Sequence, residues 1–253
     1  MCGRTTVTIQ DVAILAEELG VPIESMPDGL VPRFNMAPTQ EYFVVREHQE
    51  KREAIPAKWG LINRWAKDAK RASMQINARA AGIESKPAFR DAFRKRRCIV
   101  AVDGFYEWSG EKKNRQPFWF HRPDGKLLLM AGLYEAWQPE PGRALQTTYT
   151  IITTEANELI SNIHDRMPVI LSPDDVDAWL FEGEQDLEKL KELLVPAAAD
   201  LLVPRAVSQE VNNARFDTPT MVEPAGGVDY PSAPPPTKPA EPEVSPVAPR
   251  LLP

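Results

Sequence analysis

Short apolar runs rich in β-branched and aromatic residues are the feature that most constrains how this chain can fold. The runs lie at 42–45, 99–102, 117–121, 127–133 and 147–154. Their length and composition are typical of β-strands. No regular βαβ alternation separates them. The pattern therefore predicts an α+β domain with a largely antiparallel β core.

Helical periodicity is limited to a few segments that would flank this core. The periodic segments are 9–19, 86–96, 173–181 and 185–194. The first begins with a possible capping box from Thr8 to Asp11 and ends at Gly20. A further strand is expected over 54–61. Because it contains Pro56, we expect an edge or irregular strand there.

The composition of the chain changes near residue 222. From Glu223 onward, 10 of 31 residues are proline and large apolar side chains are almost absent. Such a segment cannot bury enough surface to offset the entropy lost on ordering. We therefore expect one domain over 2–222 and a disordered tail over 223–253.

Charge is unevenly distributed along the chain. Residues 1–154 carry 23 Lys and Arg against 18 Asp and Glu, whereas residues 155–200 carry 3 against 12. A basic first part is compatible with a face that binds a polyanion, although charge alone is weak support.

The cysteine count and the apolar runs bear on the compartment. Only Cys2 and Cys98 are present, which argues against a disulfide framework and for a reducing cytosol. No signal peptide is visible, and no apolar run approaches the ~20 residues that span a bilayer. Cys98 lies in an apolar run and is expected to be a buried strand residue.

The N-terminal segment could carry out an unusual reaction. Cys2 directly follows the initiator Met1, so removal of Met1 would give Cys2 a free α-amine beside its thiol. The two groups titrate near ~8 and ~8.5, so both have a nucleophilic fraction at neutral pH. Such an aminothiol condenses with an aldehyde to an imine and closes to a five-membered thiazolidine. Alternatively, Cys2 is simply a small residue at a frayed terminus.

Three polar residues interrupt apolar segments and are candidates for chemistry. Glu107 lies between aromatic residues, where it is paired, exposed by strand alternation, or a proton carrier with a raised pKa. His164 could be a proton carrier or a structural histidine. Asn77 could be a positioning group or a turn residue. Together with Cys2 they are compatible with a cysteine-nucleophile site.

Other classes of site are disfavoured, and a DNA-binding face is compatible with the sequence. No His/Cys cluster has metal-ligand spacing, and no Walker or Rossmann glycine pattern occurs, so neither metal nor cofactor is expected. Arg4, Arg79 and Arg166 each lie within two residues of a candidate site residue. If those segments converge, three guanidiniums could bind a phosphodiester backbone. Trp65 and Met36 could stack on bases or simply pack in the fold.

Seven short motifs, in order, resemble the SRAP family of abasic-site processing proteins (SOS response-associated peptidase-like) over roughly residues 2–222. The motifs are Met1-Cys-Gly-Arg4, Asn35-Met-Ala-Pro38, Trp59-Gly-Leu61, Ile76-Asn-Ala-Arg79, Asp103-Gly-Phe-Tyr-Glu-Trp108, Ile163-His-Asp-Arg-Met-Pro168 and Val211-Asn-Asn213. Each motif is weak alone, and their order makes the match strong. The resemblance implies a compact domain with a barrel-like β core and a positively charged groove.

The resemblance also implies an activity and a site. The resemblance implies a protein that crosslinks itself to abasic sites in single-stranded DNA through Cys2. Asn77 would position the sugar, and Glu107 and His164 would handle protons. The expected DNA contacts are Arg4, Asn35, Pro38, Trp65, Arg79 and Arg166. The protein would be a cytoplasmic monomer that joins the nucleoid on DNA damage.

The chain departs from the family pattern at two places, and two alternative functions stay open. Ala81 and Gly82 stand where the family usually has Glu-Thr, and Asn63 and Arg64 stand where Pro-Ser is common. One alternative is a thiol-dependent peptidase that uses Cys2 as its nucleophile, as the family's name suggests. The other is a non-catalytic binding module in which Cys2 plays no part.

Overall fold

The computed structural model describes residues 2–70, 74–111, 115–138, 140 and 142–232. Within these ranges the strands are β1 (Thr5–Val7), β2 (Arg33–Met36), β3 (Glu41–His48), β4 (Lys51–Trp59), β5 (Asn77–Arg79), β6 (Arg97–Val102), β7 (Gly104–Ser109), β8 (Gln116–His121), β9 (Leu128–Trp137), β10 (Gln146–Glu155), β11 (Arg166–Pro168), β12 (Ile170–Leu171) and β13 (Val203–Ala206). The helices are α1 (Val12–Leu19), α2 (Arg90–Lys95), α3 (Val176–Leu180) and α4 (Leu187–Glu192). The predicted α+β class is confirmed.

Five strands close into a barrel. They follow one another in the order β10, β4, β3, β6 and β9, and β9 pairs with β10 to complete the ring. Every pairing in this ring is antiparallel except that of β4 with β10. Closure removes free strand edges and leaves an interior filled by side chains. Val44, Trp59 and Ile151 are fully buried there. The expected barrel-like, largely antiparallel core is thus confirmed.

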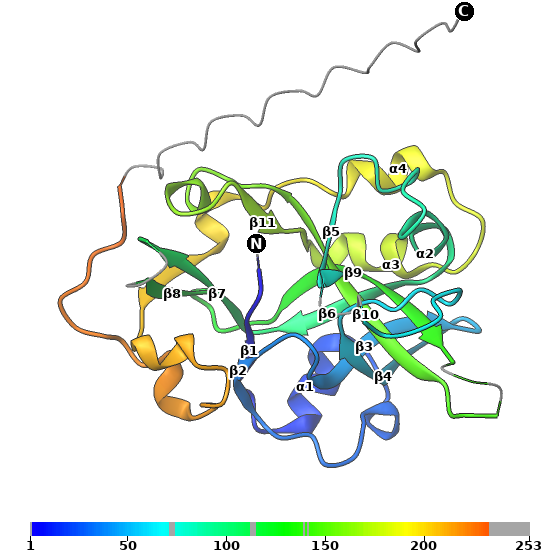
Figure 1. The fold of residues 1–253 in the computed structure, drawn as a ribbon, viewed down its shortest axis with the longest axis horizontal. Coiled ribbons are helices and arrows are strands. Elements are labelled where there is room, and N and C mark those ends of the chain that lie inside the picture. The colour runs from blue at the N-terminus through cyan, green and yellow to red at the C-terminus, as the bar shows by residue number, and fades with distance from the viewer. Residues whose placement is uncertain (1, 71–73, 112–114, 139, 141, 233–253) are drawn as a thin grey trace, which may run out of the picture.

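A second sheet brings the N-terminus to the barrel. Its order is β13, β8, β7, β1 and β2, so β1 lies between β7 and β2 (Figure 1). Asp103, which joins β6 to β7, accepts hydrogen bonds from the side chains of Thr6 and Thr8 at 2.6 Å each. The next residue, Gly104, has to be glycine because a Cβ at this position would lie 2.0 Å from the indole nitrogen of Trp119. This junction fixes the start of the chain against β7.

Two further strands, β5 and β11, pair with the second half of β10. There β5 runs parallel to β10, with Asn77 beside Ile151 and Arg79 beside Thr153. On the other side β11 runs antiparallel to β10, with Arg166 beside Glu155. Residues that are far apart in the sequence therefore lie side by side near the N-terminal strand (Figure 1).

The helices are shorter than the sequence pattern predicted. The cap of α1 is Asp11, whose carboxylate accepts from Ala13 N at 2.8 Å, whereas Thr8 binds Asp103. The expected capping box is therefore wrong, although Gly20 ends the helix in a left-handed conformation (φ 62°) as expected. The prediction of an edge or irregular strand at Pro56 is confirmed for that part of β4. Pro56 is exposed and pairs with Phe43 of β3, and β4 meets β10 only beyond it, at Lys58 and Trp59.

The folded part continues beyond the expected boundary at residue 222. Ala225 N donates to Ala206 O at 2.8 Å. Tyr230 packs edge-on against Phe118 and Phe120, and its hydroxyl donates to Leu159 O at 2.7 Å. One large aromatic side chain is enough to hold this proline-rich segment against the domain. The rest of the expected tail, 233–253, lies outside the described residues.

Candidate functional site

Cys2 lies at the centre of the candidate site. The residue is fully buried just before β1, and its carbonyl accepts a hydrogen bond from Asn77 Nδ2 at 2.8 Å. Burial raises the pKa of the Cys2 thiol far above its ordinary value, and the charge of Glu107 raises it further. The buried thiol therefore ionises less readily than the exposed cysteine that the sequence-based expectation assumed.

Glu107 reaches the same place from β7. Antiparallel pairing sets Thr5 opposite Phe105, and Tyr106 N donates to Arg4 O at 3.0 Å. This register brings Glu107 alongside the residues that precede β1, and its side chain is buried. The carboxylate thus lies beside Cys2, away from bulk solvent.

His164 lies in the loop before β11 and is half-buried. Its Nδ1 accepts from Arg166 N–H at 2.9 Å and lies at the same distance from Asp165 Oδ1. The contact with Asp165 would be an ion pair only if the ring were protonated. Burial lowers the pKa of His164, although the charge of Glu107 opposes this effect. Because Nδ1 accepts from Arg166 N–H, a neutral ring carries its proton on Nε2.

Asn77, at the start of β5, binds the backbone of Cys2. Its Nδ2 is used on Cys2 O, while Oδ1 is buried and accepts no hydrogen bond from any described residue. An unused acceptor in that position can receive a hydroxyl or amine proton of a bound molecule. The structure thus brings together Cys2, Asn77, Glu107 and His164.

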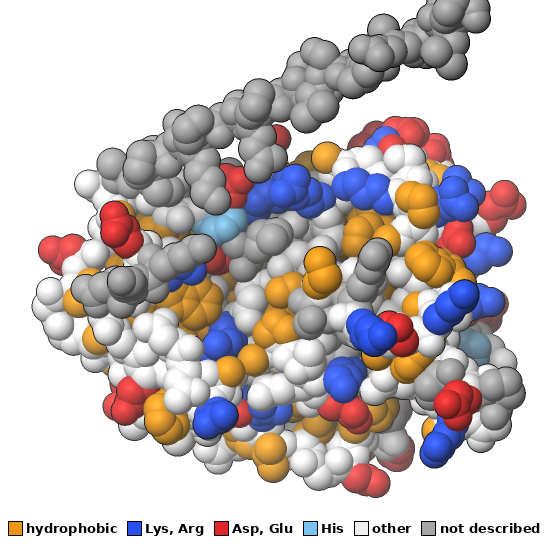
Figure 2. Space-filling model, in the orientation of Figure 1, with side chains coloured by type: hydrophobic (Ala, Val, Ile, Leu, Met, Phe, Trp, Pro, Cys, Tyr) orange, Lys and Arg blue, Asp and Glu red, His pale blue; other side chains and the backbone are white. Residues whose placement is uncertain are grey.

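A group of cations borders this site. Arg79 on β5 and Arg166 on β11 flank β10, and Arg166 donates through Nη2 to Thr153 O. Lys86 donates to Ala81 O at 2.6 Å. Burial and then the charge of Arg79 lower the pKa of both Arg166 and Lys86. We call Arg79, Lys86 and Arg166 the cationic cluster. Figure 2 shows Lys and Arg side chains gathered beside a histidine on this face.

Lys86 was not predicted from the sequence. It reaches the cluster because the chain turns back after β5, where Gly82 adopts a left-handed conformation (φ 69°) and accepts from Ser85 N at 3.2 Å. Gly82 is one of the four residues that depart from the family pattern. The only signal in the sequence was the pair Gly82 and Lys86, a turn residue followed by a cation.

Arg4 and Asn35 both make hydrogen bonds within the protein. Arg4 Nη1 donates to Asn35 Oδ1 at 2.6 Å and to Val211 O at 2.7 Å. Asn35 is fully buried, and its Nδ2 donates to Phe216 O at 2.8 Å. The prediction that Asn35 contacts DNA is therefore wrong. Its side chain instead fastens the 211–216 segment to β1 and β2.

The remaining expected DNA contacts are Pro38 and Trp65. Pro38 follows β2 and is half-buried. Trp65 is 69% exposed in the loop between β4 and β5. Trp108, which the sequence analysis did not single out, lies 6.0 Å from the Arg4 guanidinium and donates to Asn212 Oδ1 at 2.6 Å.

Two further findings concern metal ions and membranes. Within the described part of the chain, no three His, Cys, Asp or Glu side chains are grouped so as to hold a metal ion. Within the same residues, no helix has the length and apolarity needed to cross a membrane.

The sequence and the fold match known proteins over most of the chain. A family model described as SOS response associated peptidase (SRAP) matches residues 1–214. The chain is 37% identical to the abasic site processing protein YoqW of Bacillus subtilis, over 88% of this chain and 99% of that protein. It is 32% identical to the abasic site processing protein HMCES of Rattus norvegicus, over 89% and 76% respectively.

Solved structures give the same picture of the fold. The crystal structure of a protein from Bacteroides thetaiotaomicron superposes with a TM-score of 0.74 at 25% identity, over 88% of this chain and all of that one. A protein from Bordetella bronchiseptica gives a TM-score of 0.68 at 25% identity, over 82% of this chain and all of that one.

Proposed function

This chain belongs to the SOS response associated peptidase (SRAP) family, and on that premise we propose that it captures abasic sites in single-stranded DNA through a covalent bond to Cys2. Relatives that cover nearly the whole chain are named for processing this lesion. The observation that carries the proposal is the hydrogen bond from Asn77 to Cys2 O, which holds the N-terminal residue beside Glu107.

The reaction requires removal of Met1, which frees the α-amine of Cys2. That amine attacks the aldehyde of the ring-opened abasic deoxyribose and, with loss of one water, forms an imine. The Cys2 sulfur then bonds to the imine carbon while the thiol proton passes to the nitrogen, closing a thiazolidine. Because the thiol gives up its proton only in this second step, a raised thiol pKa is compatible with the chemistry.

Glu107 and His164 divide the proton transfers. The buried carboxylate of Glu107 takes a proton from the Cys2 ammonium, which must be neutral to attack. The protonated form of the His164 ring gives its Nε2 proton to the ring oxygen of the closed sugar while the bond from that oxygen to the anomeric carbon breaks and the anomeric hydroxyl loses its proton, which leaves the ring neutral. A substrate locked as the open aldehyde should therefore restore the crosslinking rate of His164→Gln but not of Glu107→Gln. Equal rescue of both variants would contradict this division.

The cationic cluster binds the phosphates on either side of the lesion. Its three side chains lie at the edge of the strands that carry Asn77 and lead to His164, so a backbone held there passes the nucleophile. Arg4, Pro38 and Trp65 remain proposed contacts to the same strand. Single-stranded DNA is the expected form because a buried nucleophile needs a flexible backbone to reach it.

A thiol-dependent peptidase is the alternative that the family description suggests. Cysteine nucleophiles of that class rely on a lowered thiol pKa beside a cationic histidine. Here the pKa of the Cys2 thiol is raised and that of His164 is lowered, which counts against the alternative. Peptide cleavage in the absence of DNA would support it.

A denaturing gel tests the proposal. Purified protein, shown by intact mass to lack Met1, is mixed with an abasic single-stranded oligonucleotide. A shifted band should survive denaturation for the wild type but not for Cys2→Ala or Cys2→Ser. Because both variants keep an α-amine, borohydride should trap each as a reduced imine. Cys98→Ala, which changes the other buried cysteine, should behave as the wild type. A stable band with Cys2→Ala would refute the assignment.

A further inference from the structure

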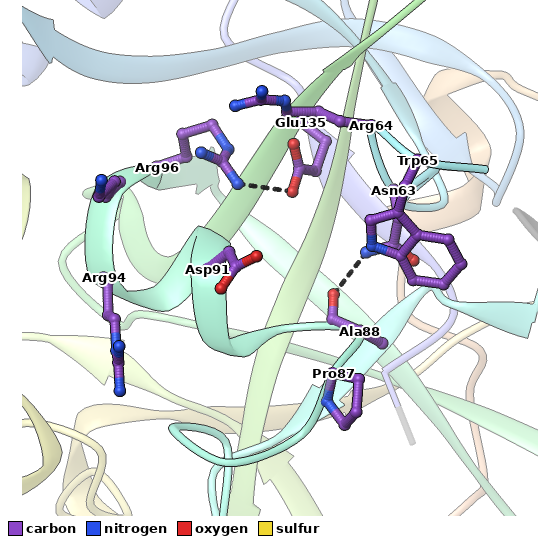
Figure 3. Close-up of a pocket in the computed structure, with 10 residues that line it drawn as sticks. Asn63, Arg64, Trp65, Pro87, Ala88, Asp91, Arg94, Arg96 and Glu135 are labelled. Atoms are coloured by element: carbon purple, nitrogen blue, oxygen red, sulfur yellow. Dashed lines mark hydrogen bonds and ion pairs between the residues drawn. The ribbon is translucent and has the colours of Figure 1, made fainter.

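A cavity lies beyond the cationic cluster. It has a volume of about 540 Å³, within the range of small-molecule and nucleotide pockets. The wall carries Asn63, Trp65, Pro87 and Ala88, and cations lie around the rim. Asn63 Nδ2 donates to Ala88 O at 2.6 Å, which fixes two parts of the wall together (Figure 3). None of the four residues grouped around Cys2 lines this cavity.

A buried carboxylate faces this cavity. Glu135 on β9 is 3% exposed, and its Oε1 accepts from Arg96 Nη2 at 2.8 Å. Its Oε2 is also buried but accepts no hydrogen bond from the residues that the structure describes. Figure 3 shows the carboxylate directed into the cavity between Arg96 and Arg64. A buried oxygen without a donor is costly, so the site favours a ligand that brings an N–H group.

The other wall residues indicate the class of that ligand. Trp65 is 69% exposed, so a flat ring can stack on it, and Arg64, Arg94 and Lys95 supply positive charge. An aromatic wall with surrounding cations is typical of sites for single-stranded nucleic acid. Asp91 also lines the cavity, and a phosphate placed against Asp91 and Glu135 would be repelled by both carboxylates. A base edge with an N–H donor satisfies all three features.

The cavity is also within reach of the strand that the cationic cluster would hold. Lys86 belongs to the cluster, and Pro87 and Ala88, the next two residues, line the cavity. Adjacent Cα atoms are only ~3.8 Å apart, so the two sites are neighbours.

We propose that this cavity binds one unpaired nucleobase of the same DNA strand, and that Glu135 Oε2 favours the bases with an exocyclic amino group (adenine, cytosine and guanine) over thymine by accepting a hydrogen bond from that group. This inference rests on the proposed function, because it needs single-stranded DNA at the cluster. Thymine presents a carbonyl oxygen where adenine and cytosine carry the amine, and that oxygen would face the carboxylate. Trp65 contributes stacking to every base, whereas Glu135 discriminates among them.

Binding to a set of oligothymidylates tests the proposal. Each contains one unreactive tetrahydrofuran abasic analogue and a single dA, dC or dT at one nearby position, and affinity is measured by fluorescence anisotropy with the full chain. We expect one position at which dA and dC bind at least fivefold more tightly than dT. Glu135→Gln keeps an oxygen for Arg96 but adds an amide donor, so it should abolish or reverse this preference.

A second variant separates stacking from discrimination. Trp65→Ala changes an exposed side chain and should weaken binding of all three bases at the same position by a similar factor. The inference is overturned if no position shows a preference above twofold, or if the preference persists in Glu135→Gln. Crosslinking of the wild type to a reactive abasic site in oligothymidylate reports on the proposed function separately. Crosslinking without any base preference would overturn this inference alone.

Discussion

Replacing Asn77 with alanine tests whether the position of Cys2 sets the crosslinking rate. The substitution removes the Nδ2 donor that lies 2.8 Å from Cys2 O, and Cys2 is fully buried. Leaving a buried carbonyl without its donor costs about 1–3 kcal/mol. If the transition state loses this whole energy while the bound ground state relaxes and loses none of it, crosslinking should slow about 5- to 150-fold.

The rate is measured under single-turnover conditions with saturating abasic single-stranded DNA, on denaturing gels. Asn77→Asp keeps the size of the side chain but replaces the donor with an acceptor, so it should be at least as slow. Gln185→Ala removes another side-chain amide that donates to backbone, to Ala178 O at 2.8 Å, and should keep the wild-type rate. A rate for Asn77→Ala within twofold of the wild type would refute the reasoning.

Further predictions concern DNA binding, stability and the end of the domain. Alanine at all three positions of the cationic cluster should reduce the log–log salt slope of single-stranded DNA binding by about 2, and an unchanged slope would mean that the contacts lie elsewhere. Because burial lowers the pKa of His164, the free energy of unfolding in urea should fall as pH drops below about 6.5, less steeply in His164→Gln. An equal slope in both proteins would contradict this. A chain ending at Ser232 should unfold like the full chain. One ending at Val222 loses the packing of Tyr230 and should be about 1–3 kcal/mol less stable; equal stability of the two truncated chains would contradict that role.

The strand order could not be read from the sequence, although the strands of the barrel themselves could. Apolar runs predicted β3, β6, β9 and β10, because burial on a pleated surface requires them. The capping signal at Thr8 failed because Asp103, 95 residues away, offers its hydroxyl a stronger partner. Local patterns predict local structure until a distant charged group competes with them.

The candidate site was partly predictable for the same reason. The positions of Cys2, Asn77, Glu107 and His164 follow from motif order, and the structure brings them together. Motif position did not reveal that Asn35 is turned inward, because burial depends on the 211–216 segment that covers it.

Two other features depend on contacts across the chain. Lys86 reaches the cationic cluster through a local turn whose direction the sequence does not specify. Glu135 is one strand position among several, and its pairing with Arg96 spans 39 residues. Alternation along β9 gave no sign that one carboxylate oxygen would face a cavity.

The most direct test of the central claim is the intact mass of the crosslinked species, combined with alkylation of its thiols after denaturation. The account predicts a mass equal to protein without Met1 plus abasic oligonucleotide minus one water. It also predicts that iodoacetamide modifies Cys98 but not Cys2, because the Cys2 sulfur is part of the thiazolidine ring. A crosslinked species in which both cysteines are alkylated, or in which Met1 is retained, would contradict the account.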